Sequence, residues 1–158
     1  MKLGFALAAA AVIAIPVPTA MAQTSHEHTI VRSQDIQWEA ASAALPAGAQ
    51  VAVLVGDPRK EGLYVLRLRG PKGYRLPPHT HPNQEVITVI SGTMNLGMGE
   101  TADPTKAKAL PAGTFFTMPP AMAHFAFFEE ETILQASAIG PSVINYINPK
   151  DDPRQKTQ

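Results

Sequence analysis

The hydrophobic residues of this chain fall in short runs that are separated by glycine and proline. Val51 to Val55 is an apolar run typical of a buried strand, and it ends at the turn sequence Gly56-Asp57-Pro58. Leu63 to Arg69 alternates apolar and polar residues in its second half, as a half-exposed strand does. No segment shows sustained helical periodicity. Strands are therefore the expected elements from residue 50 onward.

Further strands are expected along the rest of the chain, at a spacing of about 8–12 residues. Leu76-Pro77-Pro78 is held extended by its prolines, and Gly99 to Lys108 is expected to be a polar loop. The other expected strands are 86–90, 93–98, 115–118, 124–128, 132–139 and 142–147. Many short strands with glycine and proline between them predict an all-β protein, either a sandwich or a closed barrel.

The amino-terminal residues have a different pattern. Leu3 to Ile15 is an unbroken apolar run behind Met1-Lys2, and Ala20-Met21-Ala22 has the small-x-small form of a cleavage site. We therefore expect a secretory signal peptide that is cut after Ala22, and a mature protein that is periplasmic or secreted. The expected regions are a signal peptide (1–22), an N-terminal tail and arm (23–49), one barrel domain (50–148) and a polar C-terminal tail (149–158).

Composition narrows the function classes. The chain has 158 residues, of which 45% are hydrophobic, which is enough for one compact domain. Its 13 basic and 13 acidic residues give a formal net charge of zero and form no basic stripe. This argues against nucleic acid as a partner, and against membrane association of the mature form. The absence of cysteine excludes disulfides, thiolate ligands and thiol nucleophiles.

One short segment concentrates residues that bind metals. His79 and His81 are one residue apart, so they point to the same side of an extended strand. Glu85 follows the turn sequence Pro82-Asn83-Gln84, at the head of the next expected strand. If this turn folds one strand beside the other, two imidazoles and a carboxylate converge on one point. His124 follows a later strand and a proline-containing turn, and it offers a fourth ligand.

Together these two segments resemble the paired motifs of the cupin superfamily. The first motif, Gly73 through His79, His81 and Glu85 to Gly92, matches the cupin pattern at every position. The second motif retains Gly113, Pro119 and His124 but has Ala121 where cupins have glycine and Phe128 where they have a polar residue. Because a glycine would tolerate positive φ, we expect Ala121 to alter or strain its turn. The resemblance implies a jelly-roll barrel, also called a double-stranded β-helix.

The resemblance also implies one divalent transition metal ion per chain, held by His79, His81, Glu85 and His124. Neutral imidazole suits Zn, Cu, Fe and Ni, and the carboxylate extends this range to Mn. Four ligands on an octahedral ion leave about two positions open for substrate, water or dioxygen. A reactive metal is therefore expected in preference to a purely structural one.

Residues near the motifs are candidates for a cavity lining or for the ordinary core. These apolar candidates are Leu66, Ile87, Met94, Met98, Phe116, Met118 and Phe125. The groups that could lie around the ligands or transfer a proton are Tyr64, Tyr74, Gln84 and Tyr146, and no spacing argument selects one of them. The catalytic residue is thus not identified from sequence.

Two classes of function remain open. The first is a small-molecule metalloenzyme, for which the resemblance to cupins points most often to a non-haem dioxygenase, with redox-neutral lyase or isomerase activity as an alternative. The second is a non-enzymatic periplasmic cupin that binds or senses a metal or small ligand, similar to the cupin half of certain anti-sigma factors. A homodimer is expected in either case, because Val51 to Val55 is apolar enough to form a sheet edge that needs covering.

Overall fold

The computed structural model describes residues 28–155. The predicted signal peptide (1–22) and its cleavage site after Ala22 lie outside the described residues. All elements belong to one compact unit that begins at Val31. The strands described are β1 (Glu39–Ala40), β2 (Gln50–Val55), β3 (Gly62–Gly70), β4 (Arg75–Thr80), β5 (Glu85–Ser91), β6 (Thr93–Met98), β7 (Lys108–Pro111), β8 (Phe115–Met118), β9 (His124–Phe128), β10 (Thr132–Gly140) and β11 (Asn145–Tyr146).

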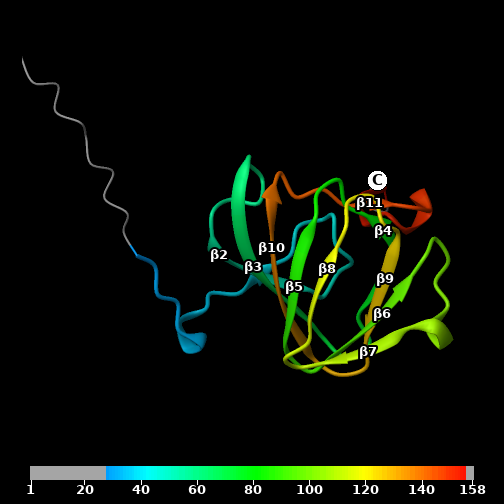
Figure 1. Ribbon diagram of the computed structural model, residues 1–158, viewed down its shortest axis with the longest axis horizontal. Coiled ribbons are helices and arrows are strands. Elements are labelled where there is room, and N and C mark those ends of the chain that lie inside the picture. Colours follow the sequence, from blue (N-terminus) through cyan, green and yellow to red (C-terminus); the bar gives the residue numbers. More distant parts are fainter. Residues whose placement is uncertain (1–27, 156–158) are drawn as a thin grey trace, which may run out of the picture. The chain divides into compact units, whose positions relative to one another are not determined.

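These strands form two antiparallel sheets that face each other (Figure 1). The six-stranded sheet has the order β1-β2-β3-β10-β5-β8, and the five-stranded sheet has the order β11-β4-β9-β6-β7. Strands that are consecutive in sequence often lie in opposite sheets, as β4 and β5 do. This is the all-β jelly-roll barrel that the strand pattern and the cupin motifs predicted.

The core lies between the two sheets. In β5, Ile87 and Val89 alternate with more exposed residues and are buried, as expected for a strand with one face against the core. They pack with Met94 of β6, Phe128 of β9 and Leu134 of β10, so both sheets contribute to one apolar cluster. Burial of this cluster is the main stabilising contribution that can be assigned to particular residues.

Two prolines shape β4. The register of β4 against β9 shifts between Leu76 and His79, where Pro77 and Pro78 lie. Proline has no N–H to donate to a sheet ladder, so the regular pairing is interrupted there. Side chains three residues apart on a regular strand point to opposite faces, so Leu76 and His79 would normally do so. The irregularity allows both side chains to face the barrel interior, where both line the same cavity.

The observed elements differ from the expected ones at a few places. The strand β7 (Lys108–Pro111) was not predicted. It begins at the last residue of the expected loop, Gly99 to Lys108, and pairs with β6. Only Asn145–Tyr146 of the expected strand 142–147 is paired. Short 3-10 helices occupy Ser33–Asp35, Pro104–Lys106, Pro149–Asp151 and Pro153–Gln155. Their residues are polar or proline, and no helical periodicity in the sequence predicts these helices.

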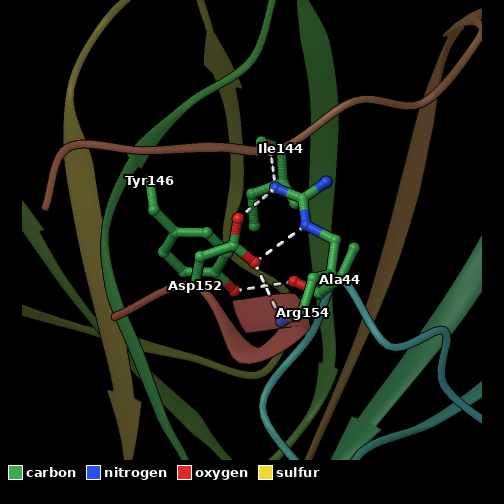
Figure 2. Close-up of polar contacts among 5 residues, drawn as sticks. All are labelled: Ala44, Ile144, Tyr146, Asp152 and Arg154. Atoms are coloured by element: carbon green, nitrogen blue, oxygen red, sulfur yellow. Dashed lines mark hydrogen bonds and ion pairs between the residues drawn. The ribbon is translucent and has the colours of Figure 1, made fainter. Parts of the chain in front are cut away.

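The carboxyl-terminal segment is fastened to the barrel by Arg154 (Figure 2). Its guanidinium donates hydrogen bonds to the Asp152 carboxylate, with Nε 2.8 Å from Oδ1, and to the Ile144 carbonyl at 3.2 Å. In the same view the hydroxyl of Tyr146 donates to the carbonyl of Ala44 at 2.7 Å. Tyr146 thereby joins β11 to the segment before β2.

The segment from residue 31 to 49 lies along the six-stranded sheet. Glu39 and Ala40 pair with Val51 and Gln50, so this segment adds a short strand to the sheet. The Trp38 ring stacks on the guanidinium of Arg69, which lies 4.5 Å from the ring centroid. Trp38 therefore holds this segment against β3 by a cation–π contact. Within residues 28–155, no helix is long and apolar enough to cross a membrane.

Candidate metal centre

Two strand ends bring the histidines together. His79 lies in β4, His81 follows the end of that strand, and His124 begins β9. His79 and His124 are directly opposed in the β4–β9 register. The turn after His81 leads into β5, which begins with Glu85 in the facing sheet.

The three imidazoles form one cluster. Their ring centroids are 4.2 Å apart for His79 and His124, 4.8 Å for His79 and His81, and 5.4 Å for His81 and His124. Each histidine offers one ring nitrogen, and the three nitrogens lie within 4.8 Å of one another. A first-row divalent ion has bonds of about 2.0–2.1 Å to imidazole nitrogen and so joins nitrogens up to about 4.2 Å apart, which small ring rotations bring within reach here. The cluster therefore fits a metal with three histidine ligands.

Main-chain carbonyls determine which nitrogen of each ring is free. Nδ1 of His79 lies 2.7 Å from the Pro77 carbonyl, Nδ1 of His81 lies 2.8 Å from the Val143 carbonyl, and Nδ1 of His124 lies 3.0 Å from the Met122 carbonyl. A carbonyl oxygen can only accept, so a neutral imidazole in this position carries its proton on Nδ1. The lone pair is then on Nε2, which is the arrangement of a metal ligand with a fixed orientation.

Burial keeps two of the imidazoles neutral. Desolvation lowers the pKa of His79 to about 3, and the nearby His124 acts in the same direction. Desolvation also lowers the pKa of His124 to about 4, against a raising effect from its hydrogen bond to the Met122 carbonyl. Only a neutral imidazole can bind a metal. At neutral pH these two imidazoles are therefore in the neutral form that binds a metal cation.

Glu85 lies beside this cluster. Its Oε2 is 3.4 Å from Nε2 of His81, and both side chains are largely buried. Burial raises the pKa of Glu85, and the neighbouring His81 acts in the opposite direction. Among the described residues, the group of potential ligand atoms that lie within 4.8 Å of one another comes from His79, His81 and His124 and does not include a Glu85 oxygen. Of the four sequence-predicted ligands, three thus form the cluster, and Glu85 contacts it through His81.

A cavity of about 450 Å³ opens beside the histidines. Three of the candidate lining residues, Leu66, Ile87 and Met94, do line it. The other four do not, because Met118 and Phe125 are buried elsewhere, Phe116 packs against the core cluster and Met98 is half exposed. Most of the remaining wall is aliphatic: Val51, Val53, Leu68, Leu76, Ala126, Leu134, Ala136 and Ile144.

The segment before β2 also lines this cavity, which the sequence did not indicate. Gln37, Glu39, Ala40, Ser42, Ala44 and Leu45 all contribute. Nothing in their spacing marks them as cavity residues, because their position depends on the pairing of β1 with β2 and on the Tyr146 bond to Ala44. The carbonyls of Pro77, Met122 and Val143 were not predicted either, because main-chain groups leave no residue-type signal in a sequence.

The four candidate polar groups occupy different environments. Tyr64 lines the cavity and is buried, whereas Gln84 is exposed. The Tyr146 ring lies 6.2 Å from the His79 ring, but its hydroxyl is bound to the Ala44 carbonyl. The Tyr74 hydroxyl is buried in the core and has no hydrogen-bond partner among the described residues. Only Tyr64 thus combines a hydroxyl with a place in the cavity wall.

Comparison with a protein-family model matches residues 26–143, which include both histidine segments, to the ChrR cupin-like domain. The chain belongs to this cupin family. The match covers most of the chain and agrees with the two-sheet architecture of the described residues.

Curated relatives are germin-like cupins. Germin-like protein subfamily 2 member 1 of Arabidopsis thaliana is 35% identical over 83 residues, which cover 52% of this chain and 37% of that protein. Germin-like protein 1-1 of Oryza sativa is 35% identical over 65 residues, or 40% of this chain and 30% of that protein. The matched segment thus spans about a third of the length of these relatives.

Solved structures share the architecture. The polyketide cyclase from Streptomyces resistomycificus has a TM-score of 0.67 and 17% identity, covering 84% of this chain and 94% of that protein. An acetylacetone dioxygenase from Acinetobacter johnsonii has a TM-score of 0.60 and 15% identity, covering 82% of this chain and 83% of that protein. At these identities the similarity establishes the fold alone.

Proposed function

We propose that this cupin is an exported, metal-dependent enzyme that acts on a small organic molecule, with dioxygenation as the reaction class. The observation that carries the proposal is a group of three imidazoles, two buried and one half-buried, at the wall of an apolar cavity, each with Nδ1 bound to a main-chain carbonyl. A structural metal does not need an adjacent cavity, whereas a reactive one needs room for a ligand.

His79, His81 and His124 would hold the metal, with Glu85 as a fourth ligand or as a hydrogen-bond acceptor beside His81. When bound, a redox-active divalent ion such as Fe, Mn or Cu supplies Lewis acidity and electron transfer to dioxygen. The protein contributes the fixed imidazoles and the aliphatic walls that exclude water. A compact, largely apolar substrate with an oxygen group at one end suits a cavity of about 450 Å³.

The names of fold neighbours agree with this proposal without establishing it. One of them is an acetylacetone dioxygenase, and another is a salicylate 1,2-dioxygenase solved with gentisate. Both names refer to small oxygen-bearing organic molecules. Diketones, phenols and flavonols are therefore the first compounds to screen.

Reconstitution tests the proposal. Metal-free protein is loaded separately with Fe(II), Cu(II), Mn(II), Ni(II) and Zn(II), and oxygen uptake is measured with each class of compound. We expect uptake with at least one redox-active ion and none with Zn(II). If no redox-active ion supports uptake with any compound, the dioxygenase proposal fails.

A redox-neutral reaction is the second candidate. It is favoured by the polyketide cyclase, whose TM-score of 0.67 is higher than the 0.60 of the dioxygenase from Acinetobacter johnsonii. Conversion of a substrate by the Zn(II) form without oxygen uptake would support it. Metal or ligand binding with no conversion at all would support a binding or sensing cupin.

We propose export on the sequence pattern alone. The apolar run Leu3 to Ile15 and the site at Ala20-Met21-Ala22 support a signal peptide. The mature chain is then expected to begin at Gln23 and to reside in the periplasm or outside the cell. Intact-mass measurement on natively expressed protein tests this, and retention of Met1 would contradict it.

A further inference from the structure

Among the described residues that line the cavity, one polar side chain outside the histidines and Glu85 is buried. It is Tyr64, which is 2% exposed. The other polar lining residues are all exposed: Gln37, Glu39, Ser42, Arg59 and Ser142. A ligand oxygen that enters the cavity leaves its hydrogen bonds to water behind, and it needs a buried donor to replace them.

The strand register places Tyr64 on the same face as Glu85. Tyr64 of β3 is opposite Ala138 of β10, and Ala138 is opposite Glu85 of β5. Directly opposed residues point to the same side of a sheet, so all three face the barrel interior. The methyl group of Ala138 leaves space between Tyr64 and Glu85, which lie two strand spacings of about 4.8 Å apart.

The Tyr64 hydroxyl has the protonation state that a hydrogen-bond donor needs. Burial raises its pKa, a hydrogen bond with the Ser142 hydroxyl lowers it, and the Glu85 carboxylate raises it again. The hydroxyl therefore keeps its proton at neutral pH. The other two tyrosines cannot take this role, because Tyr146 donates to the Ala44 carbonyl and Tyr74 is outside the cavity lining.

We propose that Tyr64 is a substrate-binding residue whose hydroxyl donates a hydrogen bond to an oxygen of the small molecule in the cavity. This inference rests on the proposed function, because it assumes that the ligand binds beside the histidines. It adds a requirement for the ligand: an acceptor oxygen within reach of both the imidazole cluster and β3.

Two probes separate this role from a structural one. 4-Nitrocatechol carries oxygen acceptors, whereas imidazole can bind a metal but has no oxygen. Each is titrated by calorimetry into Ni(II)-loaded wild type, Tyr64→Phe and Tyr74→Phe. Tyr74→Phe is the matched control, because it removes a buried hydroxyl that has no hydrogen-bond partner among the described residues. Elemental analysis gives the metal content of each sample.

We expect Tyr64→Phe to weaken 4-nitrocatechol binding about tenfold, to leave imidazole binding within about twofold, and to keep its metal. Tyr74→Phe should bind both probes as the wild type does. Equal 4-nitrocatechol affinity in wild type and Tyr64→Phe, or an equal loss for both probes, would overturn the inference while leaving the metal centre intact. A wild type that takes up no metal would overturn the proposed function and this inference together.

Discussion

His79 and His124 occupy directly opposed positions on β4 and β9, with ring centroids 4.2 Å apart. They are distant in sequence, and only the pairing of these two strands brings them together. His79 is also paired with Tyr146 on its other side. The cluster therefore exists only when the five-stranded sheet has formed, so metal binding and folding should stabilise each other.

Removal of one imidazole should abolish stable metal binding. We expect His81→Ala to lose most of the approximately one metal ion per chain that the wild type holds, because two imidazoles bind a divalent ion much more weakly than three. Elemental analysis after desalting measures this. His28→Ala, which changes an exposed histidine before the barrel, is the control and should keep its metal. Equal metal content in wild type and His81→Ala would show that the metal is held elsewhere.

The metal-free protein should lose stability as the solution becomes acidic. Burial lowers the pKa of His79 to about 3 and that of His124 to about 4, from 6.5. Between these values and pH 6.5 the unfolded chain binds more protons than the folded chain. The free energy of unfolding should therefore fall as pH drops through this window, by up to about 1.4 kcal/mol per pH unit for each histidine. Urea unfolding of chelator-treated protein from pH 7 to pH 4 measures this.

Glu85 opposes this trend, because burial raises its pKa and its ionisation above pH 4.5 costs stability. The control is a His79→Gln/His124→Gln variant, which keeps Glu85 and should show a much flatter pH dependence. A variant with the same slope as the wild type would assign the effect to other groups.

Replacing Ala121 with glycine should stabilise the protein. Ala121 adopts φ 59° and is the one non-glycine with positive φ in the described part of the chain. The strain expected from the cupin pattern is therefore present. Glycine removes this strain at some cost in unfolded-state entropy, so we expect a gain of about 0.5–1 kcal/mol in unfolding free energy. Chemical denaturation of Ala121→Gly measures it, and Ala123→Gly, where φ is not positive, should destabilise.

Self-association remains a prediction. β1 pairs only with Gln50 and Val51, so the outer edge of β2 from Ala52 to Val55 has no strand beside it among residues 28–155. We expect a dimer in which this edge is covered, and Val55→Lys should shift it toward monomer. Light scattering at high micromolar concentration measures the mass of the wild type and of each variant, and so distinguishes monomer from dimer. The control is Phe115→Lys, at the other edge of the same sheet, where Phe115 is 63% exposed. A monomeric wild type would count against the prediction.

The strands and the histidines were predictable because both leave local signals. Apolar runs between glycine and proline gave the bounds of β6, β8 and β9, and the His-x-His spacing placed two imidazoles on one face. The missed strand β7 has only four residues and follows a polar segment, so no alternation was long enough to detect. Its existence depends on pairing with β6.

The surroundings of the site were not predictable from residue types. Tyr64, Tyr74 and Tyr146 were equivalent candidates in the sequence, and the strand register separates them. Tyr64 faces the cavity because it is in line with Ala138 and Glu85 across three strands. Such alignment is a long-range property, which no spacing within one segment encodes.

The hydrogen bonds that orient the imidazoles end on the carbonyls of Pro77, Met122 and Val143, which are parts of the main chain. A point mutation can delete a side chain, but it cannot delete a carbonyl. Most substitutions therefore leave the tautomer of each histidine unchanged, as long as the strands keep their pairing. Side chains in the cavity wall that lie outside the core cluster, such as Val53 and Leu66, have no such constraint and can change while the centre persists. Relatives of this protein could thus acquire new substrates by altering the wall around an unchanged set of imidazoles.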